Sequence, residues 1–166
     1  QLQNWLIAGD ADDMFTNSSS GWSSSSGKPI EVQKCGGVHM LGGPFQLNSD
    51  SVSKVYTLPK HAEVQVTARF SFIDNWDDDT AFMKLDGEVM WTEEYNWCPQ
   101  FFTMMCAKGH NACGKAQYPD RLSRIITVSM PHTGPTLSVE FGTTIPESVP
   151  SSEVSYGISS VTVEVR

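Results

Sequence analysis

The segment 74–79, which reads DNWDDD, contains four carboxylates and one amide but no basic residue. Ionised oxygen ligands gathered this closely repel one another, and Ca²⁺, which takes about six to eight oxygen ligands, relieves that repulsion. The expected ligands of a Ca²⁺ ion are Asp74, Asn75, Asp77, Asp78 and Asp79. The alternative is a turn whose carboxylates face water. A second acidic group, Asp10, Asp12 and Asp13, could hold a separate ion or none.

Aromatic residues accompany these acidic residues, at Trp76 and again at Tyr95 and Trp97. A sugar presents an apolar face of C–H groups beside a rim of hydroxyls, so its site needs an aromatic platform with amide or carboxylate partners. The expected carbohydrate-binding residues are Trp76, Asp77, Tyr95, Asn96 and Trp97, with Trp76 or Trp97 stacking on the sugar. The alternative for each tryptophan is packing in the core, to which we assign Trp22 and Trp91.

The four cysteines, at positions 35, 98, 106 and 113, are even in number and lack the close pairs of a zinc site. They favour disulfide bonds in an oxidising compartment, and a chain that begins at Gln1 without Met is typical of a secreted protein after signal-peptide removal. One option pairs Cys98 with Cys113 and Cys35 with Cys106. Pairing of neighbours in the sequence and an intersubunit bond are the others.

Composition excludes several classes of function. The 166 residues carry 11 basic and 19 acidic side chains, a net charge of −8, whereas nucleic-acid binding requires a basic surface. The same acidity disfavours anionic membranes, and no apolar run approaches the roughly 20 residues of a membrane span. The four histidines are scattered and no nucleophile or metalloprotease motif is present, so we expect no enzyme. A glycosidase could pair Asp77 or Asp79 with Glu94, but nothing distinguishes an acid from a base there.

The rest of the chain predicts strands. Apolar and polar residues alternate through 64–72, and a second alternation through 81–91 is interrupted by Asp86-Gly87, a common hairpin turn. Further strands are expected at 121–130, 136–142 and 154–165, and less distinct ones at 36–41, 52–58 and 5–7. The last long strand changes phase at Ser159-Ser160, which indicates a β-bulge. Eight or nine strands without helices predict one domain, residues 1–166, folded as an all-β, two-sheet antiparallel β-sandwich, most simply a jelly roll.

Antiparallel order places the long segments 74–79, 96–120 and 143–153 at one end of this sandwich. The tight turns at 58–61, 86–87 and 131–135 then lie at the other end. A rigid scaffold with long loops at one end presents a binding surface there. We therefore expect function at the end that carries the acidic segment.

Five short stretches carry a resemblance to a known family: LGG at 41–43, LPKH at 58–61, FIDNWD at 72–77, LDGEV at 85–89 and YGISSV at 156–161. They resemble extracellular jelly-roll domains of protist and marine-invertebrate surface proteins, which typically read FIDSWD with a late WGIDNV. The likeness covers about residues 38–166. Within these domains the chain is similar to galactose-binding lectins of the sea-anemone type.

The resemblance implies a secreted, calcium-dependent lectin that prefers galactose and forms a homodimer. Only Asp74, Trp76 and Asp77 match its motif directly, while Asp78 and Asp79 are added by the carboxylate argument. Ser159-Ser160 replaces the acidic pair of the late motif, so an ion that this pair held in relatives would be held elsewhere here. The expectation is a lectin that binds glycans with galactose-type sugars; the alternative is a protein–protein adhesion module with a purely structural calcium ion.

Overall fold

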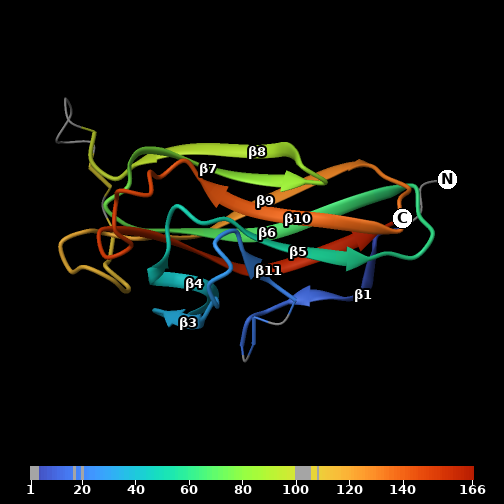
Figure 1. Cartoon of the computed structure of the whole chain (residues 1–166), viewed down its shortest axis with the longest axis horizontal. Helices are drawn as coiled ribbons and strands as arrows, with labels where there is room; N and C mark the ends of the chain where they lie inside the picture. Colours follow the sequence, from blue (N-terminus) through green and yellow to red (C-terminus); the bar gives the residue numbers. More distant parts are fainter. Residues whose placement is uncertain (1–3, 17, 20, 100–105, 108) are drawn as a thin grey trace.

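The chain folds into two antiparallel β-sheets that pack face to face as an elongated sandwich (Figure 1). This computed structural model describes residues 4–16, 18–19, 21–99, 106–107 and 109–166. The first sheet has the order β3 (Val32–Cys35), β4 (Val38–Leu47), β11 (Val154–Val165), β6 (Glu63–Asp74) and β9 (Arg121–Pro131), with β1 (Leu6–Asp13) also paired to β11. The second has the order β2 (Ser23–Ser24), β5 (Val52–Thr57), β10 (Thr136–Thr143), β7 (Asp77–Leu85) and β8 (Glu88–Asn96). The predicted all-β, two-sheet antiparallel sandwich is confirmed.

The core lies between the sheets and follows the alternation of the sequence. In β6, Val64, Val66, Ala68 and Phe70 are fully buried, and the residues between them face away from the core. Phe70 stacks on the ring of Tyr156 from the neighbouring β11, with 5.1 Å between the ring centroids. This buried apolar surface is the main stabilising contribution to the sandwich.

Two predicted backbone features are confirmed. Asp86 and Gly87 both have positive φ angles, 50° and 81°, as a tight hairpin turn requires, and they join β7 to β8. The pairing of β11 with β6 shifts register between Ser159 and Thr162, and Ser160 has a φ of 51°. That bulge lets Val161 return to the core after Ile158.

Other elements differ from the prediction. The described residues contain strands β2 and β3, which were not expected, because two and four residues are too few to show a period. The first strand continues through the acidic residues to Asp13, beyond the expected 5–7. The acidic segment is also mostly strand: β7 begins at Asp77, so only Asn75 and Trp76 separate it from β6.

The two ends of the sandwich differ as expected. The segments that follow β6, β8 and β10 meet at one end, which we call the loop end, on the left of Figure 1. The amide of Asn75 donates to the carbonyl of Glu153, and the amide of Trp97 donates to the carbonyl of Trp76, so all three segments are joined by hydrogen bonds. No helix among the described residues is long and apolar enough to cross a membrane.

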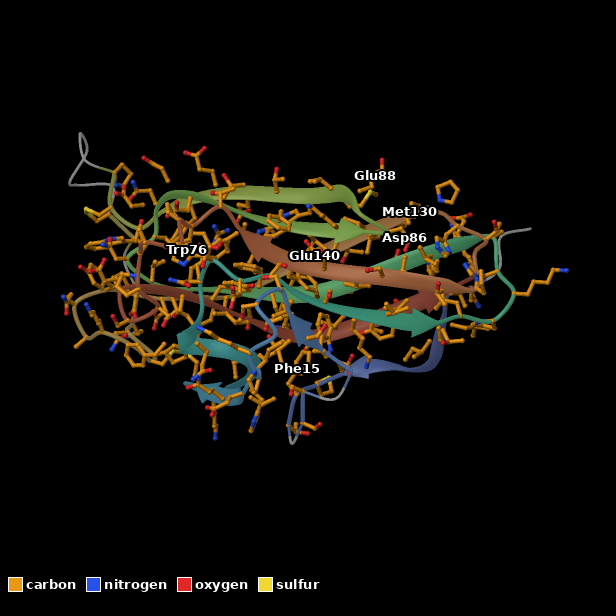
Figure 2. All side chains as sticks on the ribbon, viewed as in Figure 1. Phe15, Trp76, Asp86, Glu88, Met130 and Glu140 are labelled. Atoms are coloured by element: carbon orange, nitrogen blue, oxygen red, sulfur yellow. A yellow bond between two sulfur atoms is a disulfide. The ribbon has the colours of Figure 1, made fainter. Side chains whose placement is uncertain are left out.

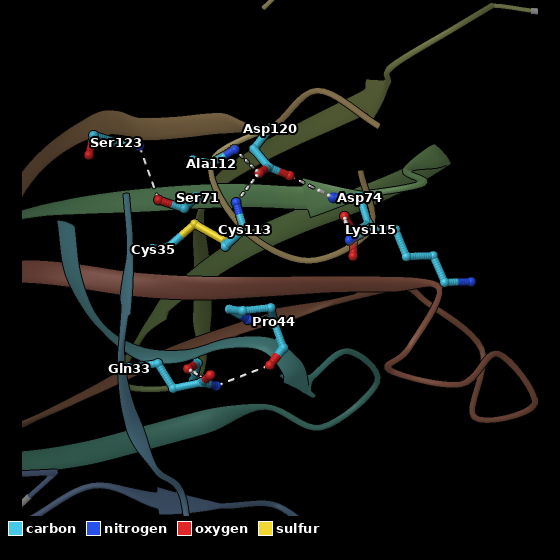
Figure 3. The surroundings of a disulfide bond; sticks show 11 residues. Gln33, Cys35, Pro44, Ser71, Asp74, Ala112, Cys113, Lys115, Asp120 and Ser123 are labelled. Atoms are coloured by element: carbon cyan, nitrogen blue, oxygen red, sulfur yellow. Dashed lines mark hydrogen bonds between the residues drawn. A yellow bond between two sulfur atoms is a disulfide. The ribbon is translucent and has the colours of Figure 1, made fainter. Parts of the chain in front are cut away.

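The disulfides join Cys35 to Cys113 and Cys98 to Cys106. The option that paired Cys98 with Cys113 is therefore wrong. The pairing of neighbours in the sequence holds for Cys98 and Cys106 but not for Cys35, and all four cysteines are bonded within the chain, which leaves none for an intersubunit bond. Cys35 ends β3, at the edge of the first sheet, and packs with Met40 of β4 and Ile73 of β6 beside the loop that contains Cys113 (Figure 3). The Cα atoms of Cys35 and Cys113 are 5.3 Å apart, within the ordinary range for a disulfide. Both bonds fit an oxidising environment.

Candidate functional site at the loop end

Trp76 does not lie on the surface. Its side chain is fully buried inside the sandwich near the loop end, edge-on to Phe72 at 4.8 Å, and its indole N–H donates to the carbonyl oxygen of Ser155 (Figure 2). A tryptophan that stacks on a sugar must expose one face of its ring. The expectation that Trp76 stacks on a ligand is therefore wrong, and Trp76 is a core residue that anchors the acidic segment.

Asp74 also turns away from the surface. One carboxylate oxygen accepts a hydrogen bond from the amide of Lys115 at 2.9 Å, and the other is buried without a partner (Figure 3). Gly114 has a φ of 75°, and a Cβ there would lie 2.4 Å from Asp74 Oδ2, so the loop passes directly over the carboxylate. Burial, together with the charge of Asp120, raises the pKa of Asp74 to about 6, against the lowering effect of the Lys115 amide. Asp74 therefore does not join the other carboxylates of the segment, contrary to the expected ligand set.

Asp120 organises this loop and was not identified from the sequence. Its Oδ2 accepts hydrogen bonds from the amides of Ala112 and Cys113, and its Oδ1 accepts one from the amide of Asp74 at 3.1 Å (Figure 3). The partners lie seven, eight and 46 residues away, so no short spacing reveals the contact. Asp120 thus holds the 112–115 loop against the end of β6.

Asp77 and Asp78 converge on one amide. The side-chain N–H₂ of Asn96 donates to Asp77 Oδ1 at 3.2 Å and to Asp78 Oδ1 at 3.1 Å. The register of β7 and β8 shifts between Asp77 and Asp79, and Asp78 has a φ of 62°. This bulge turns two successive carboxylates toward the same side chain of the neighbouring strand. The structure thus brings together Asp77, Asp78 and Asn96, all predicted site residues.

Trp97 lies beside this cluster and remains partly exposed. Its indole N–H donates to the side-chain oxygen of Asn75 at 2.8 Å, and its ring meets that of Tyr118 edge-on with 5.0 Å between centroids. Asn75 therefore serves to orient Trp97, and this oxygen is occupied. Tyr118, which sequence reasoning missed, fixes the other side of the indole. The half-buried Tyr95 packs on Phe72 at 4.8 Å, so most of its ring belongs to the core.

The acidic segment carries uncompensated negative charge. Asp77, Asp78 and Asp79 form no ion pair with any residue that the structure describes. Burial, and then the charges of Asp77 and Asp78, raise the pKa of Asp79. No three of the described acidic residues in this segment bring ligand atoms within 4.8 Å of one another; the one described group that does is Cys35, Cys113 and Asp120, whose cysteines are disulfide-bonded.

In the second acidic group, Asp10, Asp12 and Asp13, only the side chain of Asp13 is described, and it has a structural role. Asp13 Oδ2 accepts hydrogen bonds from the Lys54 ammonium at 2.9 Å, from the Tyr56 hydroxyl and from the Trp22 indole. Lys54 thus neutralises Asp13, and Trp22 is anchored in the core as expected. The side chains of Asp10 and Asp12 lie outside the described residues.

No family model and no curated protein matches this sequence. Among solved structures, the chain resembles the CBM22-1–GH10 modules of endo-1,4-β-D-xylanase 10B from Clostridium thermocellum complexed with xylohexaose, at a TM-score of 0.60 and 10% identity. It also resembles dimeric latent PorU from Porphyromonas gingivalis, at a TM-score of 0.50 and 9% identity. These matches cover 97% and 99% of this chain but only 29% and 14% of the two larger chains. At these identities the matches show the fold alone, a two-sheet β-sandwich.

Proposed function

We propose that this protein is a non-catalytic carbohydrate-binding protein, a lectin, whose site lies at the loop end. The observation that carries the proposal is the convergence of Asp77, Asp78 and Asn96 beside the partly exposed ring of Trp97. Carboxylates accept hydrogen bonds from sugar hydroxyls, an amide both donates and accepts, and an indole packs on the apolar face of the ring. Tyr95 borders this cluster from β8.

The fold is consistent with this role. Its structural neighbour from Clostridium thermocellum was solved with a bound oligosaccharide, xylohexaose, although a likeness at 10% identity supports only the fold. The sequence resemblance to galactose-binding lectins of sea anemones makes galactose the first sugar to test. The two disulfides fit a secreted protein. A lectin that cross-links cells needs at least two sugar-binding sites, so we also propose that the protein forms a homodimer. A mass near twice 18.3 kDa in sedimentation equilibrium would support the dimer.

Calcium is part of the proposal. Asp77 and Asp78 would hold the ion, because their carboxylates already face one common point and lack a basic partner. The pKa of Asp79 is raised by burial and by the charges of Asp77 and Asp78, and a bound ion would relieve this repulsion. Asp79 would add a third negative charge close to the ion. When bound, the ion would supply a strong positive charge to which sugar hydroxyls could bind directly.

Retention on immobilised sugars tests the function. The wild-type protein should be retained on galactose resin in calcium and released by EDTA, and mannose resin measures the specificity. The Asp77→Asn/Asp78→Asn variant should lose at least tenfold in affinity, and Trp97→Ala should do the same without affecting calcium binding. Tyr118→Phe, which keeps the ring beside Trp97, is the matched control. Retention on neither resin, with calcium still bound, would favour the adhesion module with a structural ion.

A further inference from the structure

A groove of about 240 Å³ lies on the outer face of the first sheet, away from the loop-end cluster. Its floor is formed by Arg69 of β6, Ser123 of β9 and Ser160 of β11. Its sides come from the β3–β4 turn, including His39, and from the segment that follows β1. The volume is below that of pockets for drug-sized ligands and suits a group of about one sugar unit.

Arg69 is unusual among the arginines of this chain. Arg121 and Arg124 pair with Glu93, and Arg166 pairs with Glu63. Arg69 forms no ion pair or side-chain hydrogen bond with any described residue, although the protein carries 19 carboxylates. None of the described residues that line the groove is acidic. A guanidinium held in a groove without a carboxylate is free to bind an external oxyanion in a bidentate manner.

A buried polar side chain lies next to Arg69 in the sheet. Ser159 of β11 is directly opposite Arg69 in the antiparallel ladder, so both side chains leave the same face of the sheet. The Ser159 hydroxyl is buried and has no hydrogen-bond partner. A buried hydroxyl without a partner is costly, so the sheet beside Arg69 contains an unused hydrogen-bonding group, although Ser159 itself does not line the groove.

Further hydroxyls are fixed at the floor of the groove. Ser123 has a φ of 57°, and its amide donates to the hydroxyl of Ser71 at 3.1 Å, which holds the bulged backbone of β9 on this face (Figure 3). Ser160 sits in the bulge of β11 that the phase change in the sequence predicted. Two bulges thus place two serines in the same groove as Arg69, and bulges often serve to re-aim side chains at functional sites.

We propose that this groove is a second binding site, for an oxyanion carried by an acidic sugar. Arg69 binds the sulfate or carboxylate oxygens, the serine hydroxyls bind the remaining oxygens, and the exposed side chain of Met14 borders the sugar ring. The site does not depend on the proposed loop-end site, since it shares no residue with it. It would add recognition of sulfated or uronic-acid sugars to a protein whose overall charge disfavours anions.

Titrations followed by two-dimensional NMR test the proposal. Sodium sulfate and sodium galacturonate are added separately at constant ionic strength, with sodium chloride and neutral galactose as references. Saturable shifts are expected at the amides of His39, Arg69, Ser123 and Ser160 with sulfate, galacturonate or both, and the two titrations show which oxyanion is preferred. Arg69→Gln should weaken this binding at least tenfold. Arg69→Lys, which keeps the charge but loses the planar fork, should weaken it less.

Matched variants separate this site from general electrostatics. Arg124→Gln removes the same charge from the neighbouring strand, where the arginine is already paired, and should change the affinity for the oxyanion less than twofold. Asp77→Asn/Asp78→Asn should leave this oxyanion affinity unchanged, even though the same variant should weaken the proposed galactose binding at least tenfold. An absence of saturable shifts with both oxyanions overturns the proposal, as does an equal response of the Arg69→Gln variant or the same shifts with chloride.

Discussion

The buried carboxyl group of Asp74 contributes to the fold, and its burial favours the protonated, uncharged form. Its folded-state pKa is about 6, above the ordinary 3.8, because the 112–115 loop buries it. The folded protein therefore holds this proton more tightly than the unfolded chain does. The resulting stability is complete below about pH 4 and is lost as the pH rises through 6. A difference of about two pKa units corresponds to roughly 2–3 kcal/mol.

We predict that Asp74→Asn removes this dependence. Asparagine keeps an oxygen for the Lys115 amide and carries no charge to bury. The free energy of unfolding of the variant, minus that of the wild type, should increase by about 2–3 kcal/mol between pH 4 and pH 7. Urea unfolding at several pH values, without reductant, measures this difference. A difference that stays constant with pH would show that Asp74 is hydrated in the folded protein.

At this scale the structure brings together only some of the residues that the sequence predicted for the site. Asp77, Asn96 and Trp97 are brought close together, since they flank one predicted hairpin. Trp76 and Asp74 are not part of that cluster, because the bend at the end of β6 turns both side chains into the protein. A run of six residues does not reveal which members face inward when it contains two positive φ angles, at Asp74 and Asp78.

Among the elements, the long strands followed directly from alternation, whereas the short edge strands depended on partners distant in sequence. Strand β3 pairs with the next strand, β4, across a two-residue turn, but it has only four residues, and the bond from Cys35 to Cys113 that also holds it joins residues 78 apart in the sequence. The pairing of four cysteines has three solutions, and the choice rests on which loops meet across the sheet. Contacts between distant parts of the chain thus determine the cysteine pairing and the short edge strands, which the alternation of apolar and polar residues does not reveal.

The two disulfides are expected to differ in their contribution to stability. The Cys35–Cys113 bond closes a segment of 78 residues and the Cys98–Cys106 bond closes one of eight. Loop-closure entropy gives about 4–5 kcal/mol for the first and about 2–3 kcal/mol for the second. Cys35→Ser/Cys113→Ser should therefore lower the free energy of unfolding more than Cys98→Ser/Cys106→Ser. Denaturant unfolding of both variants measures the two losses, and equal losses would contradict the entropic explanation.

Across the whole molecule, the negative charges behind the net charge of −8 are not evenly distributed. Asp13, Glu63, Glu93 and Glu140 each have a basic partner, which leaves the 77–79 segment as a concentration of unpaired charge at one end of the sandwich. Arg69, on the face of the first sheet, is its counterpart, a cation that forms no ion pair with a carboxylate in the part of the chain that the structure describes. The sandwich thus keeps these two opposite charges apart, as the two proposed binding sites require.

This arrangement predicts that a divalent cation stabilises the entire fold. An ion that binds only the folded protein adds about 2.7 kcal/mol at one hundred times its dissociation constant. For a chain of this length, that increase corresponds to a rise of about 5–10 °C in Tm. Thermal unfolding in EDTA and in rising CaCl₂ measures the effect. Sodium chloride at matched ionic strength shows how much of the rise in Tm comes from screening alone, since screening needs no specific ligands.

Variants locate the ion. The Asp77→Asn/Asp78→Asn variant should lose the calcium-dependent rise in Tm, whereas Arg69→Gln should retain it. An identical rise in all three proteins would place the ion elsewhere in the molecule.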